Sequence, residues 1–266
     1  MAASSSWTVD VVVVGSIPQL PLAIYVPGAP PGLEVDVDCL AYVLCSPSQT
    51  IVVDTGPNEE LARAAGFDVQ SEAVPVLDRA LRARGRALTD VSTVVHTHLH
   101  YDHMQNDSAF TAAEIVVGEP EIEFAIQQGR ENYYVGIEAF LDATKGRLRT
   151  LRSEASLGPG VHVVPTRGHT PGHQAVVVDT SIGPICLAGD EVPMSINVIV
   201  PPANSHDTHA TAAFVALARQ RQWLIVPSHD SHLGYLGTLT PDGPPQRGSL
   251  SIGGAEGGAR AGDRSP

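Results

Sequence analysis

The chain has 266 residues, of which 43% are hydrophobic and 17% are charged, a composition that supports a large folded core and excludes an intrinsically disordered protein. Its formal net charge of −13 argues against nucleic acid or an anionic membrane as a partner, but it does not repel metal cations. The longest apolar runs, such as residues 11–14, are too short to span a bilayer, and the N-terminal sequence shows no signal-peptide pattern.

Short runs rich in valine and isoleucine alternate with helical patterns along the chain. Helices are predicted at residues 74–81, at 120–128 and at 208–221, the last with Thr208 as its N-cap. Strands are predicted at residues 9–14, 40–44, 51–53, 91–95, 115–117, 161–164, 175–178, 185–188 and 223–226. Elements mixed in this order predict an α/β protein whose sheets are covered by helices.

Two segments depart from this pattern. Residues 17–31 contain five prolines, which remove amide donors and exclude a helix, so we expect an ordered loop that forms one wall of a pocket. Residues 237–266 are rich in glycine, proline and serine and poor in apolar residues, so they are predicted to form a flexible tail. The chain is therefore predicted to consist of one domain, residues 1–236, followed by that tail.

Cysteine usage indicates the compartment. The chain has an odd number of cysteines, Cys39, Cys45 and Cys186, and no Cys-x-x-Cys motif. This pattern argues against a disulfide framework and favours free thiols in the reducing cytoplasm.

Histidine and aspartate residues follow several of the predicted strands. The strands lead into His96, His169, Asp190 and His229. Side chains at strand ends are held by rigid elements, and such ends can meet at one rim of a sheet. We therefore expect these residues to converge on one site.

The segment after the fourth predicted strand carries the densest cluster. It reads His96-Thr-His98-Leu-His100-Tyr-Asp102-His103, a density of ionisable groups that packing alone does not explain. His98 and His100 can hold one ion, while Asp102 and His103 can reach a second. Imidazole and carboxylate ligands suit zinc and, less selectively, iron, manganese or cobalt. A solvated histidine cluster without metal is the alternative.

One loop cannot complete two coordination spheres, so further ligands must come from elsewhere. His169 lies in Gly-His-Thr-Pro-Gly-His, Asp190 follows a glycine after an apolar run, and His229 lies in Ser-His-Asp. Each motif alone also fits a structural or solvated residue. Their joint occurrence in this order predicts two metal ions.

These motifs resemble those of the metallo-β-lactamase superfamily. The segment HTHLHYDH carries its H-x-H-x-D-H signature at His98, His100, Asp102 and His103, and VVDTG, GHTPGH, LAGD and PSHD match its other motifs in order. The similarity covers residues 40–233 and implies an αββα sandwich with the metals at one edge. HLHYDH, PTRGHTPGHQAVVV and the single-domain length are most similar to the N-acyl homoserine lactone lactonases and related lactonases.

The resemblance assigns a role to each motif residue. It implies two divalent metal ions, expected to be zinc. The first ion would be bound by His98, His100 and His169, and the second by Asp102, His103 and His229. The two ions would be bridged by the carboxylate of Asp190.

Three further residues are expected near the metals without binding them. Asp54 would hydrogen-bond a ligand histidine and fix its ring, although an aspartate in a strand-ending turn is the alternative. His173 and His96 are expected to support the ligands or the fold.

The resemblance implies hydrolysis of a small molecule with an ester, lactone or thioester carbonyl, such as an N-acyl homoserine lactone. Hydroxide generated at the metals would attack the carbonyl carbon, and Asp102 would carry a proton to the leaving group. One position departs from the lactonases, which place a tyrosine that contacts the substrate carbonyl where this chain has Pro193. Substrate choice is expected to lie in residues 17–31, 104–110 and 194–202.

Other functions fit parts of the pattern. The same superfamily includes hydroxyacylglutathione-type thioesterases, β-lactam hydrolases and persulfide dioxygenases, which use one iron. A serine hydrolase is disfavoured because Ser195 and Ser228 lack Gly-x-Ser-x-Gly surroundings, and a non-catalytic binding module is disfavoured by the complete ligand set. The sequence leaves a homodimer open.

Overall fold

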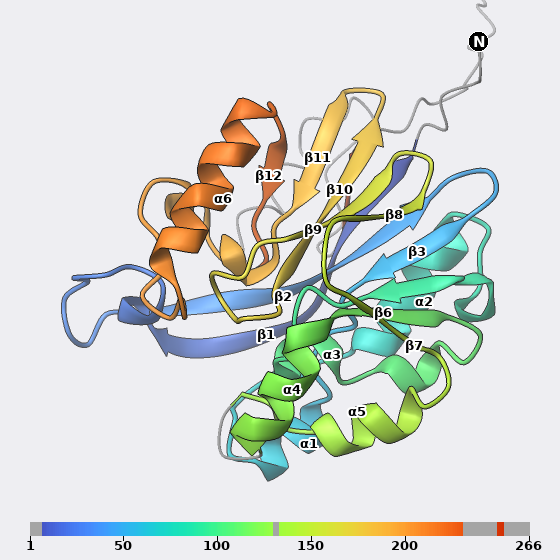
Figure 1. The fold of residues 1–266 in the computed structure, drawn as a ribbon. Helices are drawn as coiled ribbons and strands as arrows, with labels where there is room; N and C mark the ends of the chain where they lie inside the picture. The colour runs from blue at the N-terminus through green and yellow to red at the C-terminus, as the bar shows by residue number, and fades with distance from the viewer. Residues whose placement is uncertain (1–6, 130–132, 231–248, 253–266) are drawn as a thin grey trace, which may run out of the picture.

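Two β-sheets packed face to face form the centre of the molecule, and helices cover both outer faces (Figure 1). The computed structural model describes residues 7–129, 133–230 and 249–252. The first sheet, with the order β13-β1-β2-β3-β5-β6-β7 and β4 on β1, is built from Thr8–Pro21 (β1), Glu34–Cys45 (β2), Thr50–Val53 (β3), Gln70–Ser71 (β4), Thr93–Val95 (β5), Glu114–Gly118 (β6), Leu148–Leu151 (β7) and Ser249–Ile252 (β13). The second sheet, with the order β12-β11-β10-β9-β8, is built from Ala155–Gly158 (β8), Val161–Pro165 (β9), Gln174–Thr180 (β10), Gly183–Leu187 (β11) and Leu224–Val226 (β12).

The helices divide between the two outer faces. In Figure 1, α6 lies outside the second sheet, whereas the shorter helices lie beyond the first sheet. The α-helices are Glu59–Ala64 (α1), Ala73–Ala83 (α2), Tyr101–Met104 (α3), Glu119–Gln128 (α4), Ile137–Ala143 (α5) and Thr208–Gln220 (α6). The predicted α/β class is therefore confirmed, in the form of an αββα sandwich.

Alternation of side chains along the strands builds three apolar layers. On β3, Ile51 and Val53 face the second sheet, while Val52 faces the helices. On β11, Leu187 faces the first sheet and Cys186 packs beneath α6. Because successive strand residues point to opposite faces, a strand buried on both sides needs a continuous apolar run. This requirement explains the valine- and isoleucine-rich runs of the sequence.

The strand directions bring several strand ends to one edge of the sandwich. Strands β3, β5, β6 and β7 are parallel, as are β11 and β12. The loops that follow β5, β9, β11 and β12 carry the predicted metal ligands. The fold therefore gives these loops a common rim.

The proline-rich segment at residues 17–31 differs from the prediction. Strand β1 continues through it to Pro21 and pairs with β2, with an irregularity between Ile17 and Leu20 where Gln19 adopts a φ of +53°. Proline is tolerated here because this end of β1 pairs with β2 alone among the described strands, so a missing amide donor breaks no ladder on the other side. A short 3-10 helix, Leu22–Ile24 (η1), follows, so the prediction of a loop without helix was wrong for residues 17–24.

The start of α6 is also corrected. Asp207, and not Thr208, is the N-cap, because its side chain accepts hydrogen bonds from the backbone amides of His209 and Ala210 at 2.9 and 3.1 Å. Thr208 is the first residue of the helix. Both residue types can cap a helix, so the sequence alone does not distinguish adjacent candidates.

Part of the predicted tail pairs with the domain. Residues 249–252 form β13, which is antiparallel to β1 with Val9 opposite Ile252, an interaction that the sequence analysis did not predict. Four residues with alternating serine and aliphatic side chains are too short a signal to identify a strand in a glycine-rich segment. The other residues of 237–266 lie outside the described residues.

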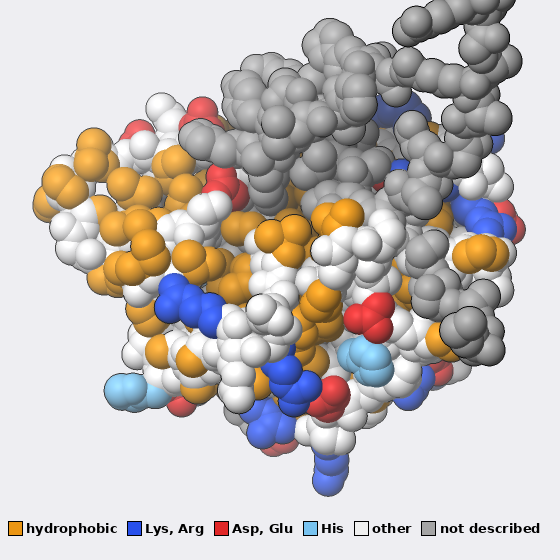
Figure 2. Space-filling model, turned by 90° about the horizontal axis from the view of Figure 1, so that it is seen from above, with side chains coloured by type: hydrophobic (Ala, Val, Ile, Leu, Met, Phe, Trp, Pro, Cys, Tyr) orange, Lys and Arg blue, Asp and Glu red, His pale blue; other side chains and the backbone are white. Residues whose placement is uncertain are grey.

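The surface shown in Figure 2 mixes both signs of charge, and hydrophobic side chains gather toward one end of it. Leu33 and Ile199 are among the exposed large hydrophobic residues. No helix within the described part of the chain combines the length and the apolar character needed to cross a membrane.

The core between the sheets should dominate the stability of the fold. Leu44 on β2 is completely buried in this layer, so Leu44→Ala should lower the free energy of unfolding by about 2–5 kcal/mol through lost burial and a residual cavity. Ile182→Ala, at an exposed turn, serves as the control and should change it by less than about 0.5 kcal/mol. Urea denaturation measures both; equal effects would mean that the inter-sheet layer is wrongly described.

Candidate metal centre

Seven predicted site residues meet at the rim of the sandwich from four separate segments of the chain. His98 and His100 lie in the loop between β5 and α3, and Asp102 and His103 lie on α3. The remaining three come from the β9–β10 loop, the 3-10 helix Gly189–Glu191 (η5) and the segment after β12, and are His169, Asp190 and His229. The structure thus brings together residues as far apart in the sequence as His98 and His229, which are separated by 131 positions (229 − 98).

The first group of donors consists of three imidazoles and one carboxylate. His100 Nδ1 lies 2.9 Å from His98 Nε2 and 3.1 Å from His169 Nε2. Asp190 Oδ2 lies 3.5 Å from His169 Nε2. One donor atom from each of the four residues falls within 4.8 Å of the others. These side chains can surround a single cation.

The second group shares Asp190 with the first. Asp190 Oδ1 lies 3.0 Å from His229 Nε2 and 3.2 Å from His103 Nε2. Asp102 Oδ2 lies 3.5 Å from His229 Nε2 and 3.6 Å from His103 Nε2. Cys39 is also within 4.8 Å of the donors of Asp102 and His229. The two oxygens of Asp190 therefore face different groups of imidazoles.

Burial keeps the first three imidazoles neutral. It is the largest influence on each ring and holds the pKa of His98 and His100 well below the ordinary value, while it lowers the pKa of His169 to about 4. The side-chain hydroxyl of Thr97 donates to Asp54, so it accepts from His98 Nδ1–H and leaves His98 Nε2 with its lone pair. Neutral nitrogens facing one another at 2.9–3.1 Å suit a shared cation better than a shared proton.

For His103 and Asp190 in the second group, the charges of neighbouring carboxylates and imidazoles outweigh burial in setting the pKa values. Burial opposes a charge on His103, but the carboxylates of Asp102, Asp190 and Asp54 outweigh it and raise the pKa of His103 well above the ordinary value. Burial likewise opposes ionisation of Asp190, yet His229 and His103 hold its pKa well below the usual range. These shifts show that the buried carboxylates require positive charge beside them.

Asp54 connects the ligand loop to α3. Its carboxylate accepts hydrogen bonds from the Thr97 amide at 2.8 Å, the Thr97 hydroxyl at 2.9 Å and His103 Nδ1 at 2.8 Å. Its backbone is left-handed, with a φ of +58°, and such strain in a residue other than glycine persists where surrounding contacts fix it. His103 Nε2, the opposite ring nitrogen, makes no hydrogen bond to a described residue and faces the carboxylates of Asp102 and Asp190.

His96 and His173 lie outside the two donor groups. His96 Nε2 is 2.7 Å from the carboxylate of Asp107, which sets that ring behind the site. His173 Nδ1 is 2.6 Å from the Thr166 hydroxyl, and its ring centroid is 5.2 Å from that of His98. The His173 ring thus packs beside His98, whereas the His96 ring packs against Phe140, with 5.6 Å between ring centroids.

Two buried glutamates near the site were not predicted. Glu121 accepts hydrogen bonds from the amides of Leu99 and Gly172 and from the hydroxyls of Tyr134 and Thr170. It therefore ties the loop of His98 and His100 to the loop of His169, while Tyr134 packs its ring 4.8 Å from the ring of His100.

Glu191 performs a similar task for one loop. Its carboxylate accepts from the amides of Gly168 and His169 at 3.1 and 3.2 Å. Gly189, two residues before Glu191, has a φ of +54°, and a Cβ atom there would come within 2.7 Å of His173 and Thr97. The sequence shows only that a glutamate follows Asp190 directly. This position alone does not tell whether the glutamate is a buried hydrogen-bond acceptor or an exposed side chain.

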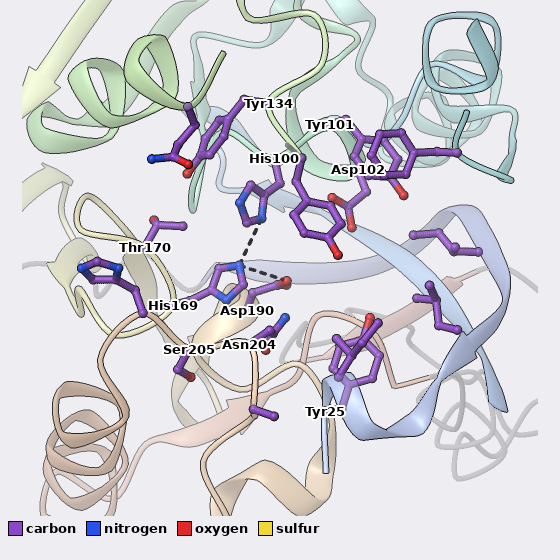
Figure 3. A pocket seen from close by; sticks show the side chains of 18 of the residues that line it. Tyr25, His100, Tyr101, Asp102, Tyr134, His169, Thr170, Asp190, Asn204 and Ser205 are labelled. Atoms are coloured by element: carbon purple, nitrogen blue, oxygen red, sulfur yellow. Dashed lines mark hydrogen bonds and ion pairs between the residues drawn. The ribbon is translucent and has the colours of Figure 1, made fainter. Parts of the chain in front are cut away.

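A pocket of about 570 Å³ opens over both donor groups, a volume in the range of small-molecule sites. Figure 3 shows His100, His169, Asp102 and Asp190 at its inner end. Aromatic and aliphatic side chains dominate the wall, including Ile17, Leu20, Ile24, Phe67, Tyr101, Phe124, Tyr133 and Tyr134. Residues 17–31 do contribute a wall, as predicted.

Tyr25 lines this pocket, whereas Pro193 is not among its lining residues. The carbonyl of Pro193 accepts a hydrogen bond from the His229 amide at 2.8 Å. Pro193 therefore fixes the backbone of His229, a candidate metal ligand. Tyr25 lines the pocket, with its ring centroid 6.0 Å from that of His229. Burial, followed by the carboxylates of Asp190 and Asp102, raises the pKa of the Tyr25 hydroxyl well above its ordinary value.

Comparison with known families agrees with this architecture. The model of the Metallo-beta-lactamase superfamily matches residues 35–229, which span every candidate ligand. The chain belongs to this superfamily. The resemblance inferred from its motifs is thereby confirmed.

Two members of the superfamily illustrate the similarity in sequence. An N-acyl homoserine lactonase of a Bacillus species is 30% identical over 171 residues, which are 60% of this chain and 66% of that protein. An N-acyl homoserine lactonase of Bacillus thuringiensis is 29% identical over 160 residues, which are 56% of this chain and 62% of that protein. The chain thus spans slightly less than two thirds of the length of these relatives.

Solved superfamily structures share the fold. A quorum-quenching N-acyl homoserine lactone lactonase has a TM-score of 0.71 at 21% identity, with 86% of this chain and 94% of that chain covered. AidC, a dizinc quorum-quenching lactonase, has a TM-score of 0.67 at 14% identity, with 94% and 95% covered. At these identities the comparison demonstrates the common sandwich.

Removing the Glu121 carboxylate should loosen the rim. In Glu121→Ala, two backbone amides and two hydroxyls lose a buried acceptor, so the free energy of unfolding should fall by at least about 2 kcal/mol. Glu123→Ala, at an exposed position on the same helix, is the matched control and should stay within about 0.5 kcal/mol of the wild type. Urea denaturation of both variants makes the comparison, and a Glu121→Ala protein of wild-type stability would contradict this role.

Proposed function

We propose that this protein is a dinuclear metal-dependent hydrolase that cleaves an ester or lactone, with an N-acyl homoserine lactone as the first candidate substrate. The observation that carries the proposal is the position of Asp190 between two groups of imidazole nitrogens, 3.0–3.5 Å from the nearest members of each. The lactonase relatives support the substrate class.

The donors fit two zinc ions. In a tetrahedral site with Zn–N distances of about 2.0–2.1 Å, neighbouring donor atoms are about 3.3 Å apart. The neighbouring donor atoms given above are 2.9–3.6 Å apart, and His103 Nε2 faces the carboxylates of Asp102 and Asp190, the orientation expected of a metal ligand. When bound, two such ions would supply a hydroxide near neutral pH and polarise a carbonyl.

The protein residues would position the substrate and move the proton. Asp102 lines the pocket, and its Oδ2 is directed at His103 and His229. Its Oδ1 would accept a proton during attack and pass it to the leaving oxygen. The aromatic and aliphatic wall would exclude water and hold an apolar acyl chain.

Alternative functions at this site differ from the proposed one in the substrate or in the metal. A thioester or β-lactam would react at the same site, and imidazole–carboxylate donors also suit iron, as in a persulfide dioxygenase. The buried free cysteines, Cys39, Cys45 and Cys186, support a cytoplasmic location. A homodimer stays a prediction.

The first test compares metal content and hydrolysis in one pair of variants. His100→Ala removes a donor at the centre of the first group, so it should lower the metal content by about one ion per chain and reduce hydrolysis by at least about 100-fold. His209→Ala changes an exposed histidine on α6 and should match the wild type. Elemental analysis and initial rates with lactones, alkyl esters, thioesters and β-lactams measure both.

Normal metal content and turnover in His100→Ala would reject the metal assignment. Hydrolysis by the wild type of thioesters or β-lactams, without lactones or esters, would reject the proposed substrate class while leaving the metal centre intact. One iron per chain and no hydrolysis would favour the oxidoreductase.

Asp54 provides a separate test of how ligands are oriented. Asp54→Asn keeps the shape of the side chain but weakens the hold on His103 Nδ1, so metal affinity should fall by about 10–100-fold. Asp179→Asn, on the exposed end of β10, is the matched control. Competition with a zinc chelator measures the affinities; unchanged affinity in Asp54→Asn would show that His103 needs no such support.

A further inference from the structure

Tyr25 presents a hydroxyl to the reaction site from a segment outside the metal-ligand motifs. Its side chain is buried, lines the pocket and lies beside His229, with 6.0 Å between ring centroids. Figure 3 shows Tyr25 across the pocket from His169 and Thr170, with its hydroxyl directed toward the inner end that Asp102 and Asp190 form. The phenol therefore faces the place where a substrate carbonyl must sit.

The backbone around Tyr25 is fixed to another loop of the pocket. The side chain of Asn197 donates to the Tyr25 carbonyl at 2.8 Å, and the Asn204 amide donates to the Ile24 carbonyl at 3.2 Å. Asn197 is itself buried and also donates to the Val200 carbonyl at 3.0 Å. These bonds fix the backbone from which the Tyr25 ring projects, and a group that acts in a transition state needs such a rigid support.

The hydroxyl of Tyr25 has no hydrogen bond to another described residue. By contrast, the hydroxyl of Tyr42 donates to the Pro227 carbonyl at 3.0 Å, and that of Tyr134 donates to Glu121 at 3.0 Å. The ring of Tyr25 is buried, and its residue lines the pocket, so the hydroxyl can meet a bound molecule there. A neutral phenol in that situation is a donor available to a ligand.

We propose that Tyr25 is a catalytic residue, whose hydroxyl donates a hydrogen bond to the carbonyl oxygen of the bound ester or lactone as negative charge develops there. This inference rests on the proposed function. Attack by the oxygen of a water molecule on the carbonyl carbon forms a C–O bond, moves the π electron pair onto the carbonyl oxygen and releases a proton, which Asp102 accepts and passes on. When that pair returns, the bond to the leaving oxygen breaks and this oxygen takes up a proton. Tyr25 keeps its own proton throughout, so it acts as an oxyanion donor.

The test removes the hydroxyl alone. Tyr25→Phe should lower kcat by about 100-fold, as expected for one oxyanion donor, with KM within about threefold of the wild type because the ground-state carbonyl gains little from the bond. Metal content should stay at the wild-type value, because no metal ligand is altered. A phosphonate monoester, which resembles the tetrahedral species, should bind at least about tenfold more weakly to the variant.

Two other tyrosine variants make the test specific. Tyr42→Phe removes a buried hydroxyl from the core between the sheets and should reduce stability without lowering kcat. Tyr101→Phe removes a hydroxyl from another buried tyrosine of the pocket, whose ring stacks on Phe67 with 4.3 Å between ring centroids. It should cost less in kcat than Tyr25→Phe.

The outcomes separate this inference from the proposed function. A wild-type protein that binds metal and hydrolyses esters, together with a Tyr25→Phe variant of unchanged kcat and phosphonate affinity, would overturn the role of Tyr25 alone. The same holds if the loss appears in Tyr101→Phe instead. A wild-type protein without metal or hydrolytic activity would overturn the proposed function itself.

Discussion

The sharing of one buried carboxylate by two groups of imidazoles is the constraint on which the site depends. Asp190 is almost inaccessible to solvent, yet it faces His229 and His103 through one oxygen and His169 through the other. A buried carboxylate is stable only beside positive charge. The parallel ends of β11 and β12 place Asp190 and His229 side by side, so the sandwich determines the geometry and the burial determines the need for cations.

Contacts outside the donor groups maintain that geometry. Asp54 has a left-handed backbone conformation, and its carboxylate accepts hydrogen bonds from both Thr97 and His103. Glu121 joins two ligand loops that approach each other only in the folded chain. Because metal ligands must be held within narrow distances, these supporting acceptors are as necessary to the site as the ligands that they orient.

The candidate donors could be named from the sequence because their chemistry is local. A cluster such as His98 to His103 is improbable without a metal, and each remaining donor follows a run that is recognisably a strand. Glu121, Glu191 and Tyr25 escaped prediction because their roles depend on contacts between distant segments. The path of residues 17–21 as a strand was missed for a related reason: a bulge and an unpaired edge make proline acceptable there, and neither is visible before the strands are assembled.

One pocket joins the candidate metal donors to an aromatic wall and to Tyr25, so the proposed metal ligands, substrate space and oxyanion donor share one cavity. The central claim is that this cavity holds two cations at once. Elemental analysis and anomalous diffraction of the full-length protein, purified without added zinc, test it most directly. The account predicts two ions per chain, one at each group of imidazoles with Asp190 between them. A single ion, or a second ion away from His103 and His229, would contradict it.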